Sequence, residues 1–235
     1  MIVTVDGPAG AGKSTVCRLL AKELGFTYLD TGAMYRAVAW AWLHASAERH
    51  GRGTGGSAPR LMDSPPDEET LLELPLRFAI QDGSMTIHHH QTKLEEQIRS
   101  PEITQLSSQF SQEACVRSFL TEWQRRLADT GDVVAEGRDM GSVVFPHASI
   151  KVYLTASLRA RTLRRLAEYE QKGEPIDYAT LEADIRLRDE RDSSRRLAPM
   201  RPADDAVMVD TSNLSIAEVV AVLKALVLNV RDQSG

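Results

Sequence analysis

A glycine-rich segment that ends in a lysine and two hydroxyl residues is the part of this chain best suited to chemistry. It fits the pattern G-x-x-x-x-G-K-[ST], in which backbone N–H groups surround a polyphosphate. Glycine allows this close approach because it has no Cβ and accepts positive φ. We expect it to bind ATP, with Lys13 on the phosphates and Ser14 on Mg²⁺. The segment consists of Gly7, Pro8, Ala9, Gly10, Ala11, Gly12, Lys13, Ser14 and Thr15.

The elements on either side of this segment are those that a phosphate loop requires. Residues 2–5 form a short apolar run that predicts a buried strand, and residues 14–24 predict a helix that ends at Gly25. The positive end of the helix dipole would then lie at the loop and favour an anion. The alternative, a glycine-rich turn that precedes a lysine by chance, fits this context poorly.

Arginine residues follow two further predicted strands. The run over residues 26–30 leads into Asp-Thr-Gly-Ala-Met-Tyr-Arg, which ends at Arg36, and the run over residues 132–136 leads into Gly-Arg-Asp-Met-Gly, which contains Arg138. Ligands bind at the carboxyl ends of strands in an open parallel sheet. Arginine grips phosphate oxygens through its planar fork and stays charged. One triphosphate does not require this many cationic side chains. Their number therefore favours a second, phosphorylated substrate.

The stretch over residues 157–200 is the most arginine-rich part of the chain. Arg161 shares a helix face with Arg164 or Arg165, and Arg188 shares one with Asp192 and Arg195. A solvated pair of helices held by salt bridges and a mobile lid are equally good interpretations of this stretch alone. Its presence beside a phosphate loop favours the lid.

The whole chain reads as an α/β protein. Strands predicted at residues 2–5, 26–30, 132–136, 150–154 and 206–210 alternate with helices, which implies a five-stranded parallel sheet. Residues 76–87 contain Asp-Gly between two alternating runs and predict a β-hairpin inside a small insert. We expect a loop over residues 44–70 and helical structure over residues 101–127.

Composition narrows the possible functions. The net charge of −5 over 235 residues argues against a protein that coats nucleic acid, and no apolar run reaches membrane-spanning length. The two cysteines, Cys17 and Cys115, are expected to be free thiols. We expect a cytoplasmic protein without a signal peptide or a membrane partner.

Other nucleotide-binding classes fit less well. A GTPase needs Asn-Lys-x-Asp or Thr-Lys-x-Asp, and the nearest string, Thr-Lys-Leu-Glu at residues 92–95, lacks the aspartate. A motor or helicase needs paired acids after an apolar strand, and no predicted strand ends in such a pair. A nucleotide-binding switch without transfer activity stays possible, although it gives no reason for a second anion site.

Four strings together are similar to those of the cytidylate kinase family of bacteria. They are residues 7–15, residues 30–36, residues 136–146 and the Arg-Asp-Glu-Arg-Asp of residues 188–192, and the similarity runs nearly from end to end. The resemblance implies the fold of the nucleoside monophosphate kinases. It also implies transfer of the γ-phosphoryl group of ATP to CMP or dCMP, with Mg²⁺ as cofactor. Another nucleoside monophosphate kinase, such as a UMP/CMP type, is the nearest alternative.

The resemblance also implies roles for individual residues. Thr31, Arg36 and Arg138 would hold the acceptor phosphate, and Lys13 with the lid arginines Arg161, Arg164 and Arg165 would act on the transferring group. The remaining implied contacts are to the acceptor sugar and base, from Ser108, Arg117, Asp139, Arg188, Asp192 and Arg195.

The same resemblance implies a division of the chain into three parts. The core would comprise residues 1–30, 103–156 and 201–235, and the monophosphate-binding region residues 31–102 with a β insert at about 76–96. Residues 157–200 would form the lid and the base-reading helix. We expect a monomer whose partners are ATP, CMP and dCMP. A Gly/Arg-rich loop near residues 46–60 is longer than is usual in the family, and no role is predicted for it.

Overall fold

The computed structural model describes residues 1–50 and 65–234, without the side chains of residues 46–50, 233 and 234. The chain forms two compact units. The first comprises Met1–Asp30 and Thr130–Gly235, and the second comprises Thr31–Asp129.

The first unit is built on five parallel strands in the order β2-β6-β1-β7-β8. This confirms the five-stranded parallel sheet expected from the sequence. The strands are β1 (Ile2–Asp6), β2 (Thr27–Asp30), β6 (Val133–Glu136), β7 (Ile150–Thr155) and β8 (Val207–Asp210).

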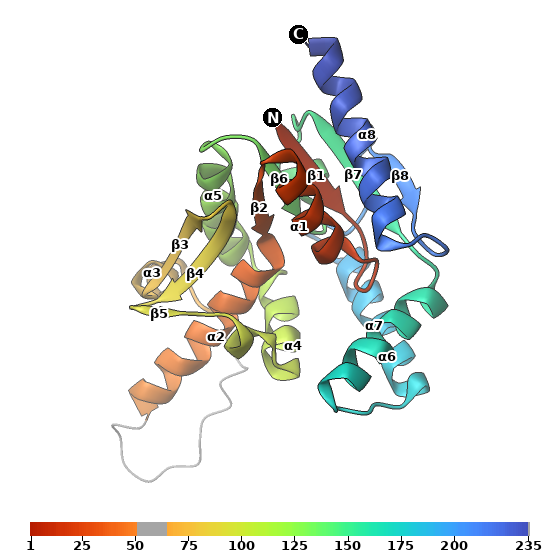
Figure 1. Cartoon of the computed structure of the whole chain (residues 1–235). Helices are drawn as coiled ribbons and strands as arrows, with labels where there is room; N and C mark the ends of the chain where they lie inside the picture. The colour runs from red at the N-terminus through yellow and green to blue at the C-terminus, as the bar shows by residue number, and fades with distance from the viewer. Residues whose placement is uncertain (51–64, 235) are drawn as a thin grey trace. The chain divides into compact units, whose positions relative to one another are not determined.

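Two helices, α1 (Lys13–Leu24) and α8 (Ile216–Ser234), lie side by side over this sheet (Figure 1). Their apolar faces form one core with the strands, which includes Val5, Leu20, Leu154 and Leu223. Helix α1 ends at Gly25, whose left-handed backbone conformation closes the last turn. The core therefore fixes where α1 begins, and this position is also the end of the phosphate loop.

The register brings polar residues together at the carboxyl ends of the strands. Asp30 of β2 lies opposite Glu136 of β6, and Val5 of β1 lies opposite the same residue. Asp6 at the end of β1 lies opposite Tyr153 of β7. The parallel strands thus place three acids, Asp6, Asp30 and Glu136, at the edge of the sheet from which the phosphate loop begins.

A pair of packed helices carries the arginine-rich stretch. These are α6 (Leu158–Lys172) and α7 (Tyr178–Ser194). Ser157 caps α6 by accepting a hydrogen bond from the N–H of Ala160, and Asp177 caps α7 in the same way from Thr180. Gly173 ends α6 in the left-handed conformation.

The second unit combines helices with a small antiparallel sheet. The turn between its two main strands is Asp82-Gly83, with φ of 50° and 71°, and this confirms the predicted hairpin. The elements are α2 (Thr31–His50), α3 (Glu68–Glu73), β3 (Leu76–Gln81), β4 (Ser84–His89), β5 (Thr92–Lys93), the 3₁₀ turn η1 (Glu96–Arg99), α4 (Pro101–Phe110) and α5 (Ala114–Ala128).

Several sequence expectations need correction. The loop expected over residues 44–70 is wrong at both ends, because α2 continues to His50 and α3 begins at Glu68. Residues 44–50 contain no glycine or proline, so nothing stops the helix before Gly51. Residues 51–64, which include most of the Gly/Arg-rich loop, lie outside the described residues.

Two further findings concern residues 101–129. The helical stretch is interrupted between Phe110 and Ala114, so it forms two helices. Both helices belong to the second unit. Helix α4 packs on α2 and helix α5 packs on α3, which explains this grouping. Cys17 and Cys115 are both free, as expected.

Candidate active site

The phosphate loop connects β1 to α1 and depends on glycine for its shape. Gly7, Gly10 and Gly12 have φ of 141°, 77° and 87°, which are values that other residues rarely adopt. A Cβ atom on Gly7 would also lie 2.0 Å from the backbone oxygen of Leu154. The loop is therefore held tightly against β7 at its first residue.

Lys13 is the buried cation of this loop, with 6% of its surface exposed. Its ammonium group donates a hydrogen bond of 2.8 Å to the carbonyl oxygen of Pro8. Burial, together with the positive charge of Arg138, lowers the pKa of Lys13 to about 7, although Glu136 acts in the opposite direction. An anion that binds in the loop would stabilise the protonated form, as phosphate binding requires.

Glu136 gathers two hydroxyl groups at the end of β6. Ser14 donates a hydrogen bond of 3.0 Å to one carboxylate oxygen, and the phenol of Tyr28 donates to the other. Burial, and then the charge of Asp30, raise the pKa of Glu136 above its ordinary value. The residue predicted to bind Mg²⁺ thus lies beside a buried carboxyl group.

Asp6 fixes the segment that follows β6. Its two carboxylate oxygens each accept a backbone hydrogen bond of 2.8 Å, one from Met140 and one from Gly141. Burial raises the pKa of Asp6 to about 6, and these hydrogen bonds limit the rise. Because both donors come directly after Arg138 and Asp139, Asp6 determines where those two residues lie.

Arg138 is anchored by helix α7. Its Nε donates a hydrogen bond of 2.9 Å to Asp192, and its Nη1 donates to the carbonyl oxygen of Gly137. Burial alone would raise the pKa of Asp192, but Arg138, Arg188 and Arg195 outweigh this effect and hold the pKa below its usual value. Asp192 is therefore a carboxylate at neutral pH.

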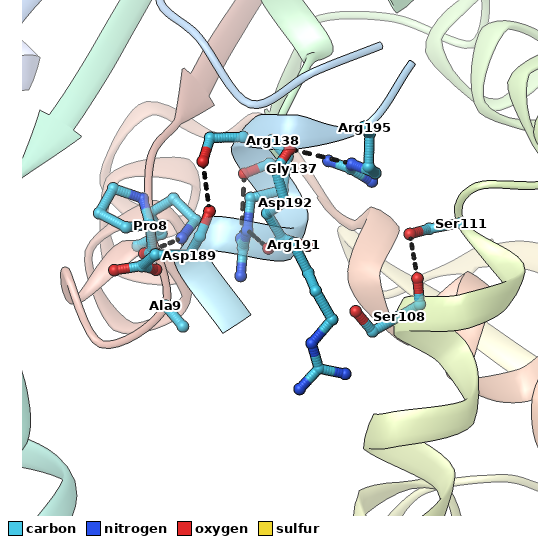
Figure 2. A network of polar contacts seen from close by, with 12 residues as sticks. Pro8, Ala9, Ser108, Ser111, Gly137, Arg138, Asp189, Arg191, Asp192 and Arg195 are labelled. Atoms are coloured by element: carbon cyan, nitrogen blue, oxygen red, sulfur yellow. Dashed lines mark hydrogen bonds and ion pairs between the residues drawn. The ribbon is translucent and has the colours of Figure 1, made fainter. Parts of the chain in front are cut away.

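The carboxyl end of α7 brings the predicted base-reading residues together. Arg195 is the residue that follows α7, and its Nε donates a hydrogen bond of 3.1 Å to the backbone oxygen of Asp192. Figure 2 shows Arg138, Asp192 and Arg195 close together at this end of the helix. Arg188 belongs to the same cluster, because its charge acts on Asp192.

The three predicted lid arginines of α6 have different surroundings. Arg161 is buried and contacts the phosphate loop, where its Nη1 donates a hydrogen bond of 3.1 Å to the carbonyl oxygen of Ala9. Arg164 donates to both the hydroxyl group and the backbone oxygen of Thr211. Arg165 forms an exposed ion pair of 2.7 Å with Glu168 of the same helix. Arg161 is thus the one of the three with a hydrogen bond to the loop among the described residues.

Thr31, Arg36, Ser108 and Arg117, the other predicted substrate contacts, belong to the second unit. Thr31 and Arg36 lie in the first two turns of α2, and Thr31 is buried.

Ser108 of α4 and Arg117 of α5 are also buried. Arg117 lies 6.0 Å from the ring centre of Tyr35 and donates a hydrogen bond of 3.3 Å to the backbone oxygen of Ser111.

Five residues of the site were not singled out from the sequence. They are Asp6, Tyr28, Glu136, Asp189 and Thr211. Asp6 ends a strand next to the phosphate loop, and Asp189 stands inside the Arg-Asp-Glu-Arg-Asp string, so both had a local signal. Tyr28 and Thr211 had none, because their partners are more than 40 residues away in the sequence.

Comparison with known families decides the relationship. The family model described as cytidylate kinase matches residues 3–229. The chain belongs to this family. No helix among the described residues has the length and apolar character of a membrane span.

Curated relatives agree with this assignment. The cytidylate kinase of Carboxydothermus hydrogenoformans is 41% identical over 227 residues, which cover 97% of each chain. That of Actinobacillus succinogenes is 40% identical and covers 94% of this chain and 95% of its own. The bifunctional pantoate ligase/cytidylate kinase of Synechocystis is 46% identical over 224 residues. The matched residues make up 93% of this chain and 41% of the length of that relative.

Proposed function

We propose that the chain transfers the γ-phosphoryl group of ATP to CMP or dCMP and forms ADP with CDP or dCDP. The observation that carries the proposal is the arrangement of cations in the first unit. Lys13 and Arg161 contact the phosphate loop, and Arg138 with Arg195 forms a second cluster around Asp192. One site suits a triphosphate and the other a monophosphate, which matches the name of the family.

Phosphoryl transfer depends mainly on positioning and on neutralising charge. In the proposed reaction the loop N–H groups and Lys13 hold the triphosphate, and Arg161 stabilises the charge that develops on the transferring group. Arg164 and Arg165 were predicted to share this role. Their contacts to Thr211 and Glu168 support a smaller direct contribution from these two arginines.

The acceptor is a phosphate oxygen that already carries negative charge, so the reaction needs no general base. We propose that Thr31, Arg36 and Arg138 hold the acceptor phosphate. Polar side chains around the base would exclude other nucleotides, because a mismatched base leaves buried polar groups unpaired. The proposed nucleoside contacts are Ser108, Arg117, Asp139, Arg188, Asp192 and Arg195.

Mg²⁺ is the proposed cofactor, and the residues present fit it. Mg²⁺ prefers oxygen ligands and is usually held by one or two carboxylates together with substrate phosphates. Ser14 and the buried carboxyl group of Glu136 supply such oxygens 3.0 Å apart. Among the described residues, no three His, Cys, Asp or Glu side chains form a metal cluster, which suits an ion that arrives with its nucleotide. When bound, Mg²⁺ neutralises phosphate charge.

A substrate panel tests the proposal. Purified protein with MgATP is supplied with CMP, dCMP, UMP, AMP or GMP, and ADP formation is followed. We expect CMP and dCMP to be the best acceptors and Lys13→Ala to abolish turnover. A preference for AMP or GMP would contradict the acceptor assignment. ADP formation that is the same with and without any monophosphate would contradict the kinase assignment and favour a nucleotide-binding switch.

The remaining parts of the proposal concern organisation. We propose that residues 157–200 act as a lid and base-reading helix, that residues 31–102 bind the monophosphate, and that the rest forms the core. Protection of the transferring group from water is the physical reason for such a lid. A cytoplasmic location and a monomeric state stay predictions, which cell fractionation and light scattering would test.

A further inference from the structure

Helix α7 carries two carboxylates that each hold an arginine from another part of the chain. Asp192 pairs with Arg138 at 2.9 Å, and Asp189 pairs with Arg161 of α6 at 2.5 Å. The two carboxylates are three residues apart, so they share one face of the helix. The role of Asp192 is part of the function proposed above, whereas nothing so far gives Asp189 one.

The partner of Asp189 is fixed on three sides. The Nε of Arg161 donates a hydrogen bond to the backbone oxygen of Ala156, and its Nη1 donates to the carbonyl oxygen of Ala9 and to Asp189. The backbone of the loop is also close, because a Cβ atom on Gly10 would lie 3.1 Å from the Cβ of Arg161. Within the described part of the chain, Nη2 of Arg161 makes no hydrogen bond. Two N–H donors of the guanidinium therefore remain for a phosphate group.

Asp189 is an unexpected residue at a phosphate site, because its negative charge opposes anion binding. Its second oxygen, Oδ1, is buried and has no hydrogen-bond partner among the described residues. The carboxylate therefore gives up part of its hydrogen bonding in order to stay against Arg161. A residue that only offset positive charge could do so from an exposed position with both oxygens hydrated.

We infer that Asp189 is a positioning residue that orients Arg161 for phosphoryl transfer. This inference rests on the proposed kinase function. Asp189 fixes Nη1, the loop carbonyl of Ala9 fixes the plane of the guanidinium, and Nη2 is presented to the transferring group. Without Asp189, Arg161 keeps its charge but loses its fixed orientation. Misplacement of a catalytic group by about 1 Å costs on the order of 100-fold in rate.

Steady-state kinetics of single and double variants test the inference. We expect Asp189→Asn to lower kcat by about 10- to 100-fold, while KM for CMP changes by less than about threefold. Because Asp189 acts through Arg161, the double variant Asp189→Asn/Arg161→Ala should be no slower than Arg161→Ala alone. Glu190→Gln, at the exposed neighbouring position on α7, is the matched control and should leave kcat unchanged.

A second substitution and an unfolding measurement distinguish a loss of orientation from misfolding. Asp189→Glu retains the charge but displaces Arg161, so it should also lower kcat, and urea unfolding shows whether each variant is folded. Effects that multiply in the double variant, or a folded Asp189→Asn with normal kcat, would overturn the inference and leave the kinase function standing. A wild-type protein that phosphorylates no monophosphate would overturn both.

Discussion

Replacement of Gly7 by alanine gives the sharpest test of the loop geometry. The new Cβ would lie 2.0 Å from the backbone oxygen of Leu154, where real Cβ atoms stay at least 3.0 Å away. The neighbouring atom belongs to the backbone of β7 and cannot turn aside. The left-handed conformation adds about 1–2 kcal/mol for a residue with a side chain, and forced overpacking typically adds about 1–3 kcal/mol. We expect Gly7→Ala to lower the free energy of unfolding by about 2–5 kcal/mol.

Gly12→Ala is the matched control, because Gly12 also has positive φ but no atom within 4 Å of the added Cβ. It should lose only the conformational part, about 1–2 kcal/mol. Urea unfolding followed by circular dichroism measures both variants, and equal m values would show that the comparison is sound. If Gly7→Ala were no less stable than Gly12→Ala, the close contact between the loop and β7 would be wrong.

Three further predictions follow from buried polar groups. Thr211→Val removes a hydroxyl that accepts from Arg164, so it should lower the free energy of unfolding by about 1–3 kcal/mol, and Thr211→Ser should retain most of it, both measured in urea. Asp6 has its pKa raised from 3.8 to about 6, so the folded state binds more protons between these values and stability falls as pH rises through them. The free energy of unfolding of Asp6→Asn minus that of wild type should rise by up to about 3 kcal/mol from pH 4 to pH 7. A difference that stays the same at both pH values would contradict this. The pKa of Lys13 is lowered from 10.5 to about 7, so between these values the unfolded state binds more protons than the folded state. The free energy of unfolding therefore falls as pH falls from 10.5 to 7. Lys13→Met should therefore be at least as stable as wild type at pH 7, while kcat falls more than about 100-fold. A loss of kcat that comes with a matching loss of folding stability would contradict the assignment.

The regular elements of the first unit could be predicted because local patterns determine them. Short apolar runs gave all five strands to within one residue at either end, and glycine marked the end of α1. The second unit was harder. Residues 44–50 continue helix α2, although hydrophobic periodicity does not extend over them. The one indication of this continuation in the sequence is that these residues include no glycine or proline. The break at residues 111–113 has neither glycine nor proline, so no local signal separates α4 from α5.

The candidate site was predictable where residue type and spacing carry the chemistry. The loop, Arg138 and the charged positions of α7 were found in this way. The partner of each arginine was not, because ion pairs between distant segments depend on packing. Arg161, Arg164 and Arg165 look equivalent in the sequence, yet one contacts the phosphate loop, one contacts Thr211 and one pairs with an exposed glutamate. Only the orientation of α6 separates them.

The carboxylates of α7 also explain how a chain of net charge −5 can contain a concentrated group of cations. The charge of Arg138 is the second-largest cause of the lowered pKa of Lys13, so buried cations in this unit repel one another. Asp192 and Asp189 lie against two of them and offset that repulsion in the folded chain. Bound phosphates would supply further negative charge, and the arginines would then need no rearrangement to meet it. The net charge of the whole chain therefore says little about the anions it binds, since the acids that balance the site are part of the site.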